Sequence, residues 1–190
     1  IILINKNTKK IMNIKSLTIY CSSSEKLTSD YYNLSNELGL YLANKSIKII
    51  YGGGNAGMMG KISKSSYSSG GKVVGIIPRF LATKASINAN ITKTIIVKDM
   101  SERKRKLFQM GDSFLILPGG PGTIEEATEI ISWKLLGIHS KEIIIFNFNK
   151  YWDPFIKMYD NSKNERFGNK NLQNITKHVR TIDQFKKLFS

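Results

Sequence analysis

A short apolar run, Ser113–Leu117, leads directly into the glycine-rich turn Pro118–Gly122 and then into a helical pattern. Runs of this length and composition are typical of a strand buried on both faces of a sheet. Pro118 ends the strand, and the glycines let the backbone turn tightly and approach a ligand. Thr123 stands where a cap of the following helix is expected. The segment therefore predicts a strand, a tight turn and a helix.

The rest of the chain alternates between strand and helix patterns. The predicted strands are Ser16–Tyr20, Ile47–Tyr51, Val73–Ile77, Ile91–Val97, Ser113–Leu117, Glu142–Phe146 and an edge strand at Ile175–Val179. The predicted helices are Asp30–Lys45 capped by Ser29, a polar helix ending at Ser69, a helix from the cap Ser101 to Met110, the helix begun by Thr123, Trp152–Tyr159, and a last helix from the capping box Thr181–Gln184. This order predicts a single-domain, Rossmann-like α/β fold: a doubly wound, mainly parallel sheet with helices on both faces. Ligands in such folds bind beyond the carboxyl ends of the strands.

Composition narrows the class of protein. The single cysteine, Cys21, excludes an internal disulfide and fits a reducing cytoplasm, where we expect the protein to act. Two histidines and one cysteine disfavour a structural zinc site, and no apolar run approaches the roughly 20 residues that span a bilayer. We expect residues 1–13 to be an N-terminal extension outside the core, and residues 14–190 to form one domain.

The net charge of +15 suggests nucleic acid as a partner, but the distribution of the charge argues against it. Only five of the 29 basic residues are arginine, and the lysines are scattered along the chain. Proteins that read nucleic acid more often gather arginine on one face or interleave it with aromatic residues. We therefore interpret the excess of lysine as a compositional bias.

The start of the helix at Thr123 has the features of a phosphate site. Free backbone N–H groups and the positive end of the helix dipole point at the turn. Glu125, Glu126 and Glu129 follow at once, and their mutual repulsion favours a raised carboxyl pKa, which suits proton transfer. The alternative is that Thr123 and Glu126 form a capping box and serve only the helix.

A second glycine-rich turn, Gly52–Gly57, satisfies the G-x-G-x-x-G pattern of dinucleotide-binding turns. That pattern also requires an acidic residue about 20 positions later, but the chain has no Asp or Glu from Leu38 to Lys98. A P-loop is excluded because Asn55 stands where its first glycine is required. We interpret the turn as one that approaches a nucleotide-like ligand; a purely structural turn is the alternative.

The segment Ser101–Lys106 places four cations in the first turns of a predicted helix, where the helix dipole favours anions. Arg103 also shares a face with Leu107 and Met110, so its stem is expected on the buried side. A basic surface cluster with buried stems is one explanation. A bound anion is the other, and local rules tend to be broken at functional sites.

These motifs together resemble those of the Lonely guy (LOG) family of cytokinin riboside 5'-monophosphate phosphoribohydrolases, which are often labelled lysine decarboxylases. They are Tyr20–Ser24, Tyr51–Gly60, Asp99–Lys104 and Pro118–Glu126, the last of which is similar to the family's PGGxGTxxE signature. The resemblance covers roughly residues 14 to 153. It implies a nucleotide-binding hydrolase domain over residues 14–190, a nucleoside monophosphate substrate, no metal or other cofactor, and a homodimer whose interface helps to form the site.

The resemblance also assigns roles to individual residues. Arg103 and Glu126 match the family's catalytic pair. The residues expected to bind substrate are Lys104, Gly119, Gly120, Pro121, Gly122, Thr123, Glu125, Gly53, Gly54, Ser23 and Ser132. Ala85 and Ser101 stand where the family often has glutamate and histidine, so the choice of base is open. A non-catalytic nucleotide or cofactor carrier of related fold, and less favourably a nucleic-acid-binding protein, are the alternatives.

Overall fold

The structure, a computed structural model, describes residues 12–83, 88–168 and 172–189. Within them seven strands form one sheet in the order β4-β3-β2-β1-β5-β6-β7, and every strand pair is parallel. The strands are β1 (Ser16–Tyr20), β2 (Lys48–Tyr51), β3 (Val73–Pro78), β4 (Lys93–Val97), β5 (Ser113–Ile116), β6 (Glu142–Phe146) and β7 (Lys177–Val179). The helices are α1 (Ser29–Asn44), α2 (Gly57–Ser68), α3 (Met100–Met110), α4 (Pro121–Leu135), α5 (Asp153–Asn164) and α6 (Ile182–Lys186). The predicted α/β fold is confirmed.

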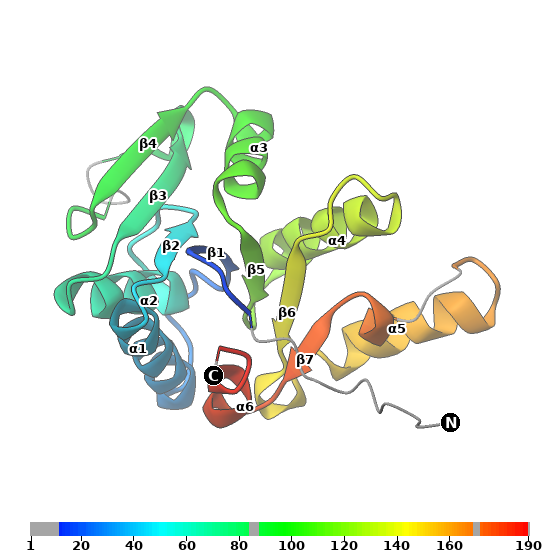
Figure 1. The fold of residues 1–190 in the computed structure, drawn as a ribbon. Coiled ribbons are helices and arrows are strands. Elements are labelled where there is room, and N and C mark those ends of the chain that lie inside the picture. Colours follow the sequence, from blue (N-terminus) through cyan, green and yellow to red (C-terminus); the bar gives the residue numbers. More distant parts are fainter. Residues whose placement is uncertain (1–11, 84–87, 169–171, 190) are drawn as a thin grey trace, which may run out of the picture.

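The sheet is wound in two directions from its centre (Figure 1). Strands β1 to β4 are added one after another on one side, and β5 then returns to pair with the other edge of β1. The change of direction between β1 and β5 separates the loops that follow these two strands. In open parallel sheets, ligands bind in the crevice that such a change of direction creates.

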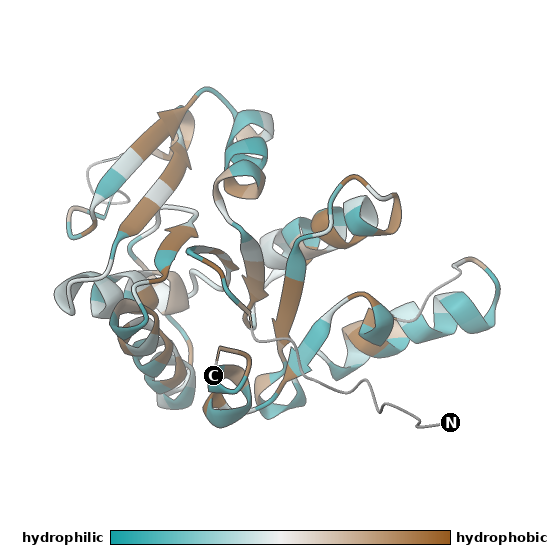
Figure 2. Cartoon of the chain, in the orientation of Figure 1, coloured by the Kyte–Doolittle hydropathy of each residue, from teal (hydrophilic) through white to brown (hydrophobic). Residues whose placement is uncertain are grey.

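Helices cover both faces of the sheet because alternate residues of each strand point to opposite sides. In β1, Leu17 and Ile19 belong to the core under α1, α2 and α6, whereas Tyr20 belongs to the core under α3, α4 and α5. In β5, Leu115 joins the first core and Phe114 the second. Figure 2 shows hydrophobic strands at the centre and largely hydrophilic outer surfaces on the helices. Within the described ranges, no helix has the length and apolar composition needed to cross a bilayer.

Two of the predicted helix caps outside the glycine-rich turn are wrong. The cap of α1 is Thr28 rather than Ser29, and α3 is capped by Asp99, not by Ser101. Asp99 accepts a hydrogen bond from a backbone N–H of the first turn of α3. The cap at Thr181 is confirmed. Where several polar residues follow one another, each is a competent cap, so the sequence does not select among them.

Other boundaries differ by a few residues. Strands β4 and β7 each begin two residues later than predicted, and α5 continues to Asn164. Residues 1–11, most of the expected extension, lie outside the described residues, as do residues 84–87, which include Ala85. Met12 is buried in the first core, and its backbone N–H donates to the carbonyl of Leu188. The last part of the predicted extension therefore contacts the core, contrary to expectation.

Candidate active site

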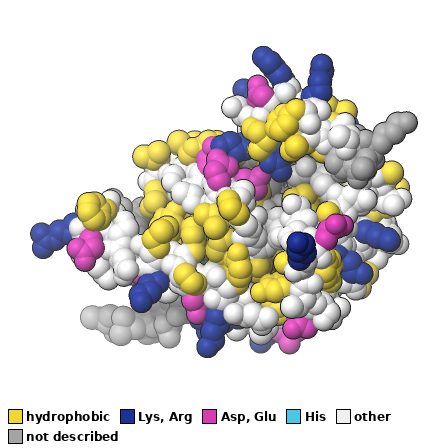
Figure 3. All heavy atoms as spheres, turned by 180° about the vertical axis from the view of Figure 1, so that it is seen from behind, with side chains coloured by type: hydrophobic (Ala, Val, Ile, Leu, Met, Phe, Trp, Pro, Cys, Tyr) yellow, Lys and Arg dark blue, Asp and Glu magenta, His cyan; other side chains and the backbone are white. Residues whose placement is uncertain are grey.

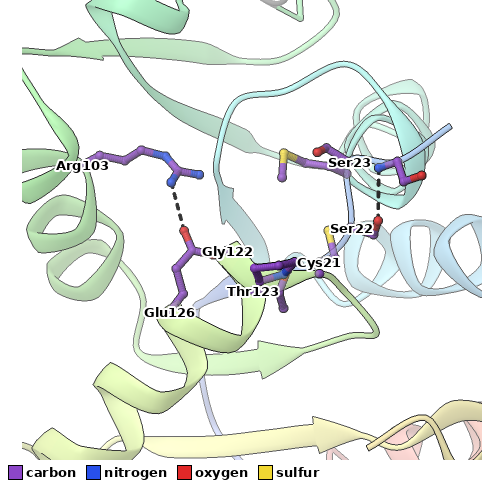
Figure 4. Close-up of a pocket in the computed structure, with 11 residues that line it drawn as sticks. Cys21, Ser22, Ser23, Arg103, Gly122, Thr123 and Glu126 are labelled. Carbon is purple, nitrogen blue, oxygen red and sulfur yellow. Dashed lines mark hydrogen bonds and ion pairs between the residues drawn. The ribbon is translucent and has the colours of Figure 1, made fainter.

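A cleft of about 370 Å³ lies at the carboxyl ends of β1 and β5 (Figure 4). Its walls come from the loop after β1, the start of α2, the first turns of α3 and the start of α4. The residues that line it are Cys21, Ser22, Ser23, Ser24, Met59, Arg103, Gly120, Pro121, Gly122, Thr123 and Glu126. Segments far apart in the sequence thus meet where the direction of winding changes, as the fold class predicts.

Arg103 and Glu126 form an ion pair inside this cleft. The Arg103 Nη1 atom donates to Glu126 Oε1 over 3.0 Å, and the two side chains are only 12% and 11% exposed. The Arg103 Nε atom also donates to the Ile76 carbonyl at 3.3 Å, which ties the guanidinium to β3. Figure 4 shows the pair on one side of the cleft and the loop that contains Cys21 and Ser23 on the other. The predicted burial of Arg103 is confirmed.

Burial changes the acidity of Glu126. It raises the pKa of this carboxyl to about 7, against the lowering effect of the Arg103 guanidinium and with a smaller raising effect from Glu125. Near neutral pH both the ionised and the protonated forms of Glu126 are therefore populated. A carboxyl group of this kind can stabilise a positive charge or exchange a proton with a substrate or water.

Repulsion among the three glutamates is not the main cause of that shift. The Lys104 Nζ atom lies 2.5 Å from Glu125 Oε1 and 3.0 Å from Glu129 Oε1, so both neighbours have a cationic partner. These bonds raise the pKa of Lys104 in turn. Desolvation of Glu126, rather than crowding by Glu125 and Glu129, dominates.

The glycine-rich turn opens α4 with backbone donors that have no acceptor within the helix. The helix begins at Pro121, with Gly120 as its cap, so Thr123 is not the cap that we predicted. The first intrahelical hydrogen bond is donated by Ile124 N to Gly120 O over 3.0 Å. The amides of Gly122 and Thr123 come before it in the chain. Amides of a first turn have no acceptor within their helix. The alternative that Thr123 and Glu126 form a capping box is therefore wrong.

The turn is held from behind by side chains. The Tyr151 hydroxyl donates to the Gly119 carbonyl at 2.7 Å. A Cβ atom added to Gly119 would lie 2.2 Å from Thr123 Oγ1, so the threonine hydroxyl occupies the space that a larger residue would need. In contrast, a Cβ atom added to Gly120 or Gly122 would have no described atom within 4 Å beyond its chain neighbours and its own helix backbone. The latter two glycines therefore face open space in the cleft.

The opposite wall is the loop after β1. Its backbone is fixed on both sides, because Ser22 N donates to Pro118 O and Ser22 O accepts from Met59 N, each at 3.1 Å. The Ser22 hydroxyl accepts from the Ser24 amide at 3.1 Å. Cys21 is buried, and burial strongly raises the pKa of its thiol. A protonated thiol is a poor nucleophile, so this thiol is not suited to nucleophilic attack.

Most of the predicted site residues meet in this cleft. Arg103, Glu126, the Gly120–Thr123 segment and Ser23 line it, whereas the other predicted residues lie outside its lining. Those residues are Lys104 and Glu125, which pair with each other, and Gly119, Gly53, Gly54 and Ser132. Ser132 lies in the fourth turn of α4, well beyond Glu126. Among the described residues, no group of three or more His, Cys, Asp or Glu side chains is arranged to hold a metal ion.

Four lining residues were absent from the predicted set: Cys21, Ser22, Ser24 and Met59. All four belong to two of the motifs, Tyr20–Ser24 and Tyr51–Gly60. Their position immediately after β1 or at the start of α2 was the sequence feature that could have indicated a place in the lining of the cleft. Which member of a short polar loop faces the cleft depends on backbone turns that sequence patterns do not specify.

The fold and the cleft define a Rossmann-like α/β protein with a buried arginine–glutamate pair at its switch point. A family model described as "Possible lysine decarboxylase" matches residues 59–188. The chain is 34% identical to the cytokinin riboside 5'-monophosphate phosphoribohydrolase of Rhodococcoides fascians, over 80% of this chain and 78% of that protein. It is 35% identical to the LOG enzyme of Oryza sativa subsp. japonica over 80% of this chain, spanning 63% of that protein. The chain belongs to the LOG family.

A solved structure shares the fold at lower sequence identity. It is described as the molybdenum cofactor binding protein from Rippkaea orientalis, and it aligns with a TM-score of 0.67 over 94% of this chain and 99% of that one. The two sequences are 17% identical. At this identity the likeness shows the fold alone, so function has to be argued from the site.

Proposed function

We propose that this protein hydrolyses the N-glycosidic bond of a nucleoside 5'-monophosphate and releases the free base and ribose 5-phosphate. The observation that carries the proposal is the buried Arg103–Glu126 pair in the cleft, directly behind the donors that open α4. The names of the relatives point to the same reaction class.

The start of α4 supplies the phosphate site in this proposal. The amides of Gly122 and Thr123 precede the helical ladder, and the positive end of the helix dipole lies at the same place. Gly120 and Gly122 leave open the space that side chains would otherwise fill. A phosphate bound there would place the sugar towards Glu126, one turn further along the same wall of the cleft.

Glu126 acts on the glycosidic carbon. As the bond between C1' and the base nitrogen breaks, positive charge develops on the ribose ring, as in glycoside cleavage generally. Ionised Glu126 stabilises that charge or takes a proton from the attacking water, whose oxygen bonds to C1'. The base leaves with the bonding electrons and receives a proton. Preorganised charges of this kind are usually the largest source of rate enhancement.

Arg103 has two tasks in the proposed mechanism. Its guanidinium keeps a fraction of Glu126 ionised at neutral pH, because it opposes the effect of burial on the pKa of that carboxyl. It also supplies positive charge near the departing base or the phosphate. Lys104 neutralises Glu125 and Glu129 and so removes two further negative charges from the neighbourhood.

We further propose that AMP-type nucleotides are substrates alongside prenylated ones. The position matching a family glutamate is Ala85, outside the described residues, and the position matching a family histidine is Ser101, which is exposed in the first turn of α3. Alanine has no polar group to replace the glutamate carboxylate, and serine has a shorter side chain than histidine and no titratable group. We accordingly expect the protein to discriminate only weakly between adenine and prenylated adenine nucleotides.

A homodimer is part of the proposal. Several large hydrophobic side chains are exposed on the monomer, among them Leu136 at 75%, Phe80 at 65%, Ile138 at 59% and Ile96 at 53%. Figure 3 shows hydrophobic side chains over much of the rear face, beside a group of acidic and basic ones. Contiguous exposed apolar surface commonly marks a protein interface.

Release of base from AMP and from isopentenyladenosine monophosphate tests the proposal. Chromatographic detection of adenine or the prenylated base, with ribose 5-phosphate in equal amount, would support it. The likeness in fold to a molybdenum cofactor binding protein makes a non-catalytic carrier the second candidate. Binding of either nucleotide without release of base, over many hours at micromolar enzyme, would favour the carrier and exclude the hydrolase.

A further inference from the structure

Gly52 is in contact with the catalytic arginine. It follows directly on β2, and a Cβ atom added to it would lie 2.3 Å from Arg103 Nη2 and 3.4 Å from Arg103 Cζ. Its next neighbour is the terminal methyl group of Met59, also at 3.4 Å. Each of these atoms is the end of a long side chain, so the backbone would not have to move to accommodate an alanine. The steric clash therefore involves the guanidinium of Arg103.

Other glycines of the same turn are required for different reasons. Gly57 has a φ of +58°, and an added Cβ atom there would lie 2.5 Å from the Ser24 carbonyl oxygen. At Gly60 the same atom would lie 2.1 Å from the Asn55 carbonyl oxygen. These neighbours are backbone atoms, so larger residues there would disrupt the loop itself. Gly52 has no left-handed backbone conformation and no backbone neighbour of this kind.

The guanidinium of Arg103 is therefore restrained at all three of its nitrogen atoms. Nε donates to the Ile76 carbonyl, Nη1 donates to Glu126, and Nη2 rests against Gly52. A planar group fixed at two corners cannot move its third corner without rotating or withdrawing. A methyl group at position 52 would push Nη2 outward and turn Nη1 away from the glutamate.

We propose that Gly52 is a positioning residue for the reaction, which leaves the space that Arg103 needs in order to pair with Glu126. Its role in catalysis rests on the proposed function, whereas its role in placing the arginine does not. Alanine at position 52 should keep the fold and lose the geometry of the pair. The phosphate site at the start of α4 should remain intact, because neither Gly52 nor Arg103 belongs to the turn.

The direct test is a carboxyl ¹³C NMR titration of Glu126, assigned with Glu126→Gln and repeated in Gly52→Ala. The charged and titratable groups around this carboxyl are Arg103 and Lys104 from α3, Glu125 and Glu129 from α4, and Tyr20 and Cys21 at the end of β1. Of these groups, the substitution displaces only Arg103. We expect the pKa of Glu126 to rise by about one unit in Gly52→Ala, since an arginine close to a carboxylate lowers its pKa by about one to three units.

Two controls make the result specific. Gly168→Ala is a matched substitution outside the lining of the cleft, and it should leave the titration unchanged; among the described residues, the added Cβ atom lies 3.4 Å from Ser162 Oγ. In an Arg103→Ala background, Gly52→Ala should cause no further shift, because its effect passes through the arginine. An unchanged pKa in Gly52→Ala, a full shift in the Arg103→Ala background, or failure of Gly52→Ala to fold would each overturn the inference.

Activity measurements then separate this inference from the proposed function. If the wild type releases base, Gly52→Ala should lower kcat at least tenfold, while the KM for the nucleotide changes less than about threefold. A tenfold loss of rate corresponds to about 1.4 kcal/mol of lost transition-state stabilisation. The midpoint of its pH–rate profile should move upward with the pKa of Glu126. A KM that changes more than kcat, together with an unchanged pH–rate profile, would contradict the positioning role. A wild type that releases no base, but whose titration shifts as expected, would refute only the hydrolase.

Discussion

Arg103 on α3 and Glu126 on α4 are joined by a 3.0 Å ion pair although both side chains are about nine-tenths buried. Burying two charges is costly, and such a pair often contributes nothing to stability compared with apolar residues. The pair lies at the carboxyl end of the sheet, beside helix amides that have no acceptor within their helix, and local rules tend to be broken at functional sites.

The open space at Gly120 and Gly122 leads to the first prediction. A methyl group at either position meets no described atom beyond its chain neighbours and its own helix backbone, so Gly120→Ala and Gly122→Ala should melt within a few degrees of the wild type. Each should nevertheless weaken binding of AMP or ribose 5-phosphate by tenfold or more, since a clash of about 1.4 kcal/mol has that effect. Calorimetric titration and thermal melting of the same samples measure both quantities. Unaltered affinity in both variants would place the phosphate elsewhere.

Gly119→Ala is predicted to behave in the opposite way. The added methyl group would collide with the Thr123 side chain, whose Oγ1 and Cβ atoms lie 2.2 and 2.6 Å from the new position. Overpacking of this kind typically costs about 1–3 kcal/mol. Denaturant unfolding should show that loss of stability, and a variant as stable as the wild type would mean that the turn is free to shift.

The pH dependence of the rate is the next prediction. If ionised Glu126 is the active form, kcat/KM should rise with pH through a midpoint near the pKa of about 7 that burial gives this group. The phosphate of the substrate also titrates, at a pKa of about 6. Arg103→Gln distinguishes the two, because it should move only the midpoint that belongs to Glu126, and move it upward. A rate that falls with pH through this range would mean that the protonated carboxyl is the active form.

Stability should also depend on the ionisation of Glu126. A glutamate in an unfolded chain has a pKa of about 4.3, whereas the pKa of Glu126 in the folded protein is about 7. Between these values the folded state binds more protons than the unfolded state, so the free energy of unfolding falls as the pH rises. Glu126→Gln removes this contribution. Urea unfolding at about pH 5 and about pH 8 should show that the wild type loses stability relative to the variant; a difference that stays constant or increases would contradict the raised pKa.

The centre of the sheet was predictable because its strands are short apolar runs that end in turn residues, whereas β4 and β7 at the edges begin with polar residues. Ser113–Ile116 and Glu142–Phe146 are buried throughout or nearly so, and their sequences admit few other structures. Helix starts were less predictable. At α4 the chain offers Pro121 and Thr123 as competing starts, and the structure uses the proline, whose fixed φ and missing N–H suit a first helical position.

Within the site, the motifs identified the residues but not how they interact. Nothing in the sequence shows that Lys104 takes Glu125 and Glu129 as partners and leaves Arg103 to Glu126, because these pairs depend on how α3 crosses α4. The sequence interpretation therefore attributed the raised carboxyl pKa to repulsion between glutamates, whereas burial is its main cause. The close approach of Gly52 to Arg103 Nη2 likewise becomes apparent only from the three-dimensional structure.

The most direct test of the account is the turnover of AMP by Glu126→Gln compared with that of the wild type, with the affinity of both proteins for AMP measured in parallel. Glutamine keeps the size of the side chain but cannot carry charge or accept a proton. We expect kcat to fall by about 10²–10⁴-fold, the usual contribution of a catalytic acid or base, while the dissociation constant changes little. Turnover by the variant at the wild-type rate would show that the buried pair is not the catalytic centre.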